Sequence, residues 1–190
     1  MLEIDDAGWG DMLDGVVLGC LRVETGVFLS RVIDVKFFKS PIFSEKQYLD
    51  EALRLTREML EELHADKSEE IRVCTAAVLE KVRETLSKEG YKITPAKIVG
   101  ELQVKVEGAF IGRLERLGLS KGSVPFEPGK ERFYVQLRWI HKDLANREKY
   151  VKTAYKSWRR WRKWQPRVKR HEAREMPAER EEDWWHWRHS

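Results

Sequence analysis

The sequence predicts an α/β fold built around a mixed five-stranded sheet. Three apolar segments separated by turns come first, an amphipathic helix follows them, and strand and helix patterns then alternate. The predicted order is β-β-β-α-β-α-β-α. Because strand-helix-strand crossovers are right-handed and connect parallel strands, we expect the later strands to run parallel to the first.

The first three segments read as an antiparallel meander. They occupy residues 2–6, 15–23 and 27–38. The run GVVLGCLRV in the second segment is apolar on both faces, which is typical of a central strand. Gly26 fits the tight turn that follows it, and Pro41 is expected to end the meander.

The next part of the chain alternates helices and strands. We predict a helix in residues 44–66, a fourth strand from residue 71 that becomes a second helix by residue 78, a fifth strand within 91–100, and a third helix over 101–117. Ser44 is the expected cap of the first helix, while Gly90 and Gly118 are expected to end the second and third.

The remaining residues form an extension and a tail. Residues 120–131 are rich in Gly, Pro and Ser and predict a loop, RFYVQLRWI in 132–140 is interpreted as an extra strand, and 144–164 as a fourth helix. The predicted division is a domain in 1–119, a loop in 120–131, a strand-helix extension in 132–165 and a flexible, basic, Trp-rich tail in 166–190.

Charge is distributed unevenly along the 190 residues. The net charge is +4, but residues 152–190 carry +6 and the rest carries −2. A near-neutral body can hold a divalent cation in an acidic pocket, while a basic tail attracts a polyanion. The sequence lacks an 18-residue apolar stretch and the pattern of a signal peptide, so we expect a cytoplasmic protein without a membrane partner.

Two adjacent carboxylates, Asp5 and Asp6, follow the first apolar strand. Two-metal phosphodiester hydrolysis uses several carboxylates to hold Mg²⁺ or Mn²⁺, and a bound cation relieves the repulsion between neighbouring acids. The alternative is structural: Asp6 caps the glycine turn through backbone amides while Asp5 is solvated. Cys20 and Cys74 lie in apolar runs without a CxxC motif and are interpreted as buried thiols.

The opening IDDAGWG resembles the DEAGRG signature of type 2 ribonuclease H enzymes, within the ribonuclease H-like superfamily. The resemblance covers residues 1–119. It departs from the signature at Trp9, which stands where the family has a basic residue, and after Gly10, where the Gly-Pro that usually follows is missing. It implies a ribonuclease H-like fold whose first strand lies at the middle of the sheet, with Asp5 and Asp6 as catalytic metal ligands for Mg²⁺ or Mn²⁺.

A third acid is less clearly marked. Such families take further acids from the fourth strand and a late helix, but IRVCTAA carries no carboxylate. We select Glu101, at the head of the third helix, as the third catalytic and metal-binding residue; an acid there also complements the helix dipole. Glu107 and Asp34 are the other candidates, and both are interpreted as surface residues.

The segment KSWRRWRKWQPRVKR holds eight basic residues and no acid in positions 156–170. Basic side chains contact phosphates and exposed aromatics stack on unpaired bases, so we predict nucleic-acid binding. The residues selected are Trp158, Arg159, Arg160, Trp161, Arg162, Lys163, Trp164, Arg167, Lys169 and Arg170. Two alternatives stay open: the tryptophans pack on the body as core, or the helix lies on an anionic membrane surface.

These features predict a metal-dependent nuclease that acts on structured nucleic acid, either an RNA-DNA hybrid or a junction, with nucleic acid as its partner. The alternative is a non-catalytic nucleic-acid-binding or scaffold protein on the same fold, because the fourth strand lacks its acid.

Overall fold

The computed structural model describes residues 1–164 and shows an α/β architecture around one five-stranded mixed sheet. The strands are β1 (Leu2–Ala7), β2 (Val16–Arg22), β3 (Val27–Ile33), β4 (Glu70–Cys74) and β5 (Lys92–Ala96). Their order in the sheet is β3-β2-β1-β4-β5. The predicted sheet and its element order are confirmed at this level.

The central strand β1 separates the antiparallel half of the sheet from the parallel half. It pairs antiparallel with β2, which pairs antiparallel with β3, and it pairs parallel with β4, which pairs parallel with β5. β5 is therefore an edge strand, which explains how it accommodates Pro95. The carboxyl ends of β1, β4 and β5 meet at one edge of the sheet.

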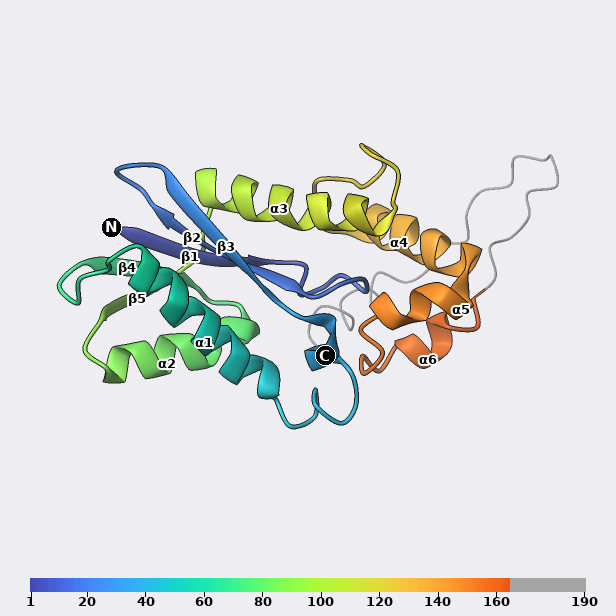
Figure 1. Ribbon diagram of the computed structural model, residues 1–190, viewed down its shortest axis with the longest axis horizontal. Coiled ribbons are helices and arrows are strands. Elements are labelled where there is room, and N and C mark those ends of the chain that lie inside the picture. The colour runs from blue at the N-terminus through green and yellow to red at the C-terminus, as the bar shows by residue number, and fades with distance from the viewer. Residues whose placement is uncertain (165–190) are drawn as a thin grey trace.

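Helices cover both faces of the sheet, as Figure 1 shows. α1 (Gln47–Glu62) and α2 (Glu80–Lys88) pack together on one face, and α3 (Glu101–Leu117) lies on the other, against β1 and β2. The predicted bounds of α3 are confirmed, and Gly118 ends it with φ of 111°. Within the described residues no helix is long and apolar enough to cross a membrane.

The third strand and the first helix have bounds that differ from the prediction. The third strand ends at Ile33 rather than at residue 38, because Asp34 accepts a hydrogen bond from the Lys36 amide at 2.7 Å and starts a 3-10 turn, η1 (Val35–Phe38). α1 begins at Gln47, and its N-cap position is Lys46 rather than Ser44. The Ser44 hydroxyl instead donates to the Pro41 carbonyl. A second 3-10 turn, η2 (Ala77–Leu79), leads into α2.

The prediction of an extra strand in residues 132–140 is wrong, because this segment lies within α4 (Lys130–Lys142). Phe133, Leu137 and Ile140 follow helical spacing and are buried. The expected single helix over 144–164 is also wrong. It is replaced by α5 (Leu144–Arg147), a 3-10 turn η3 (Glu148–Tyr150) and α6 (Trp158–Trp161).

The three tryptophans of the basic segment pack on the body, which is one of the alternatives that the sequence left open. Trp158 is 3% exposed, and its indole N–H donates to Glu148 at 3.2 Å. The Trp161 ring lies 4.9 Å from that of Phe133, and the Trp164 ring lies 5.5 Å from that of His141.

A single hydrophobic cluster joins the predicted domain to the predicted extension. It contains β1 residues such as Ile4 together with Phe133 and Leu137 of α4 and Trp158 of α6. Residues 120–164 therefore share the core of residues 1–119 and do not form a separate appendage. The predicted tail, residues 166–190, lies outside the described residues.

Candidate functional site

A cavity of about 250 Å³ opens at the carboxyl ends of β1, β4 and β5. Carboxyl ends of parallel strands are the usual place for ligands in open α/β sheets. The ionisable residues that line the cavity are Asp5, Asp6, Asp11, Cys74, Lys97 and Glu107. Four carboxyl groups and one lysine give this cavity an acidic lining.

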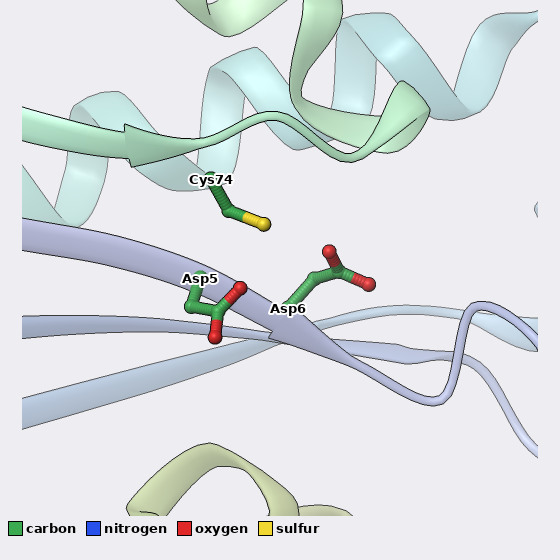
Figure 2. A group of neighbouring side chains, drawn as sticks. All are labelled: Asp5, Asp6 and Cys74. Atoms are coloured by element: carbon green, nitrogen blue, oxygen red, sulfur yellow. The ribbon is translucent and has the colours of Figure 1, made fainter. Parts of the chain in front are cut away.

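Asp5 and Asp6 converge with Cys74 at the end of β1. One ligand atom from each residue lies within 4.8 Å of the other two. Figure 2 shows Cys74 projecting from the end of β4 toward β1, where both carboxylates lie. Because β1 and β4 are parallel neighbours, their last residues meet at this edge and bring the three side chains together.

Burial sets the protonation of this cluster. Removal from water raises the pKa of Asp5, and the hydrogen bond from the Cys74 thiol partly opposes that rise. Burial also raises the pKa of Cys74 to about 12, with a further contribution from the negative charge of Asp5. Cys74 is therefore a protonated thiol at neutral pH that donates to a carboxylate.

The loop of residues 8–14 follows β1 and forms one wall of the cavity. Gly8 has φ of 91°, and a Cβ atom there would lie 2.4 Å from the Phe110 ring of α3. Only glycine fits such a close approach in that conformation. Asp11 and Asp14 of this loop are each 6% exposed, and Asp14 pairs with Arg113 at 2.6 Å.

Residues of the carboxyl-terminal part hold the 8–14 loop in place. The Gln136 side-chain oxygen accepts from the amides of Met12 and Leu13, each at 3.1 Å. The Tyr155 hydroxyl donates to the Trp9 carbonyl at 2.7 Å, and the Lys152 ammonium donates to the Gly8 carbonyl.

Lys152 is a fully buried cation behind this loop. Burial lowers its pKa to about 8, although the negative charges of Asp11, Asp14 and Asp6 oppose that effect. Its ammonium also lies 5.0 Å from the centre of the Phe38 ring.

The structure brings together only part of the site that the sequence predicts. Asp5 and Asp6 line the cavity, but Glu101 does not. Its carboxylate lies beside the turn at Gly26 and within 3.4 Å of Lys105. That turn follows Arg22, the last residue of β2, which pairs with Leu2 at the start of β1. Asp6 is near the other end of β1, so Glu101 and Asp6 lie toward opposite ends of this strand.

Glu107 is the acid that α3 contributes to the cavity, and its interpretation as a surface residue is wrong. It lies almost two turns beyond Glu101, is 8% exposed and pairs with Arg132 at 2.9 Å. Burial raises its pKa, and the Arg132 charge opposes the rise. Asp34, the other candidate, is exposed and caps η1, as the surface interpretation predicts.

No pattern in the sequence singled out the residues of the cavity wall and of the support behind it, namely Asp11, Arg132, Gln136 and Lys152. The two glycines before Asp11 signal a loop, but nothing in the sequence shows that the loop folds back over a cavity. In a strand over residues 132–140, Arg132 and Gln136 would share a face with Tyr134. In the helix, both Arg132 and Gln136 are buried.

The selected basic residues of the carboxyl-terminal segment remain at the surface where they are described. Arg159, Arg160, Arg162 and Lys163 are exposed, and Arg162 pairs with Glu148 at 2.6 Å. Arg167, Lys169 and Arg170 lie outside the described residues.

Comparisons of the chain with models of protein families, with curated proteins and with solved structures found no match.

Proposed function

We propose that this protein is a nuclease that hydrolyses phosphodiester bonds with Mg²⁺ or Mn²⁺ on a ribonuclease H-like fold. The observation that carries the proposal is the convergence of Asp5 and Asp6 at the end of the central strand, inside an acidic cavity. The strand order and the parallel pairing of β1 with β4 support it, since they give the acidic pair the position that the IDDAGWG resemblance implies.

The donor set fits a hard divalent cation. Carboxylate oxygens are preferred ligands of Mg²⁺ and Mn²⁺, and the carboxylates of Asp5 and Asp6 are close enough to share one ion. Cys74 lies on the fourth strand, where the resemblance implies a carboxylate. A protonated thiol is uncharged and is a poor ligand for Mg²⁺, so Cys74 is not one of the metal ligands in this proposal. In this proposal Asp5 and Asp6 hold the ion, and Cys74 orients Asp5 through its hydrogen bond.

The residues around the cavity have complementary tasks in this scheme. A bound cation supplies the activation of water and the neutralisation of charge on the phosphate. Lys97, the lysine in the cavity lining, offers a positive charge for a substrate phosphate. The buried turn at Gly8 packs against Phe110 and limits the access of water from the α3 side of the cavity.

Cleavage assays test the proposal directly. We expect the wild-type chain with Mn²⁺ to cleave at least one substrate among RNA-DNA hybrid, duplex, junction and single strand. The paired variant Asp5→Asn/Asp6→Asn is expected to lose at least about 100-fold in rate, since even outer-shell partners of metal ligands are worth 10–100-fold. Asp34→Asn is the matched control, because it removes an exposed carboxylate and keeps a capping side chain.

Each outcome distinguishes nuclease from binding protein. Cleavage that survives in the paired variant would contradict the assignment of Asp5 and Asp6. Binding of nucleic acid without cleavage and without a thermal shift by Mn²⁺ would favour the non-catalytic alternative, for which Cys74 in place of a fourth-strand acid is the supporting observation.

A further inference from the structure

Arg132 is a buried cation inside the wall of the cavity. Its side chain is completely inaccessible to solvent, and it enters from α4 between the 8–14 loop and α3. Nη1 donates to Asp11 at 3.2 Å and to Glu107 at 2.9 Å, and Nη2 donates to Glu107 at 2.9 Å. The guanidinium thus joins two of the four cavity carboxylates.

Backbone carbonyls complete the hydrogen bonding of this guanidinium. Nε donates to the Pro125 carbonyl at 3.1 Å, and Nη2 donates to the Phe126 carbonyl. An arginine side chain has five N–H donors in a fixed plane, and these contacts use all five. Arg132 is therefore fixed in place and has no donor left for a substrate phosphate.

The pairing divides the cavity acids into two groups. The Arg132 guanidinium is shared by Asp11 and Glu107, and the Cys74 thiol lies beside Asp5 and Asp6. A divalent ion beside Asp11 and Glu107 would have to approach a fixed guanidinium in a poorly solvated wall, where like charges repel strongly. This repulsion disfavours a second divalent ion beside Asp11 and Glu107.

We propose that Arg132 is a built-in cation that occupies the second cation position of the site, so that the cavity binds one divalent ion, at Asp5 and Asp6, instead of two. This inference rests on the proposed function and changes its expected metal stoichiometry. Arg132 acts as a positioning residue: it holds Glu107 and Asp11 in place and supplies positive charge to the cavity without contacting the substrate.

The stoichiometry of Mn²⁺ binding tests this inference without an activity assay. The full chain is titrated with Mn²⁺, and free ion is measured by electron paramagnetic resonance. Ions that bind outside the cavity are subtracted with a variant in which all four cavity acids are neutralised, Asp5→Asn/Asp6→Asn/Asp11→Asn/Glu107→Gln. We expect a single Mn²⁺ per chain at the cavity. Two ions would overturn this inference and leave the proposed function standing, whereas no bound ion would overturn both.

Two variants test the role of Arg132 itself. Arg132→Met frees Asp11 and Glu107, so this variant is expected to bind a second Mn²⁺ and to gain more thermal stability from Mn²⁺ than the wild type does. The paired variant Arg132→Met/Glu107→Gln is expected to return to one ion. A folded Arg132→Met chain that still binds one ion would contradict the inference.

Glu107→Gln in the wild-type background provides a second measurement if Arg132→Met does not fold. The amide keeps an oxygen for the guanidinium but cannot replace a carboxylate as a ligand. We expect the Mn²⁺ stoichiometry to stay at one ion per chain. Loss of the bound ion in this variant would show that Glu107 is itself a ligand and would overturn the inference.

Discussion

At the scale of single residues, the candidate site depends on a carboxylate and a thiol that are buried together. Asp5 is 7% exposed, and desolvation makes its ionised form costly. The Cys74 thiol donates a hydrogen bond to that form and so compensates part of the cost. Burial and the same contact both raise the pKa of the Cys74 thiol, so we expect it to react slowly.

The reactivity of Cys74 is therefore expected to report on the charge of Asp5. In Asp5→Asn the negative charge is lost, so the pKa of Cys74 falls and its thiolate fraction rises at a given alkaline pH. We expect faster alkylation of Cys74 by iodoacetamide at pH 9 than in the wild type, measured by mass spectrometry. Asp34→Asn is the control, and an equal rate in Asp5→Asn and wild type would contradict the proposed contact.

At the scale of elements, α4 decides the geometry of the cavity wall. One face of this helix carries Arg132 and Gln136 inward, four residues apart, and both reach Asp11. Gln136 also accepts from the amides of Met12 and Leu13, so the helix satisfies backbone donors that the 8–14 loop cannot pair by itself.

Replacing Gln136 tests the dependence of the 8–14 loop on α4. Gln136→Met keeps the side-chain length but leaves two buried amides and Asp11 without this partner. Each unsatisfied buried group costs about 1–3 kcal/mol, so we expect a loss of about 2–5 kcal/mol in the free energy of unfolding, measured by urea denaturation. Arg138→Met, an exposed change on the same helix, should have little effect. Similar stability losses in both variants would contradict this role.

At the scale of the whole molecule, the basic carboxyl-terminal segment has two parts with different tasks. Trp158 belongs to the core that also contains Ile4 and Phe133, so we expect its burial to contribute to stability. Arg159, Arg160, Arg162 and Lys163 around it are exposed, and we expect this basic surface to attract a polyanion.

Two truncations separate these tasks. A chain that ends at Tyr155 loses Trp158 and is expected to lose about 3–5 kcal/mol of stability, as for removal of a buried aromatic. A chain that ends at Trp164 keeps that core residue but lacks Arg167, Lys169 and Arg170. We expect it to keep its melting temperature and to bind single-stranded nucleic acid more weakly.

The salt dependence identifies the cause of the weaker binding. Each lost phosphate contact flattens the log-log slope of affinity against salt by about 0.7–0.9. Fluorescence anisotropy over a salt series measures that slope. The matched control is the full chain carrying Arg167→Gln/Lys169→Gln/Arg170→Gln, which should flatten the slope in the same direction. An unchanged slope in the shorter chain would contradict the prediction that the tail binds nucleic acid.

Local patterns in the sequence predicted the order of the elements along the chain, the five strands and the acidic pair on the first strand. Alternating apolar segments, the long amphipathic helix and the glycine at position 118 are short-range signals, because each reflects the conformation of a few neighbouring residues. The register that places Asp5 and Asp6 at the end of β1 follows from the same signals. Both residues of this pair line the cavity, and their role as metal ligands stays a prediction.

Only the tertiary structure decided which other residues join that pair. Glu101 and Glu107 lie on one helix, and the packing of α3 against β1 directs Glu107, not Glu101, into the cavity. Residues 132–140 have the aromatic and branched composition of a strand, yet burial against the shared core makes them a helix and brings Arg132 to Glu107 across 25 positions of sequence. Such long-range contacts depend on where whole elements pack, which local residue patterns do not specify.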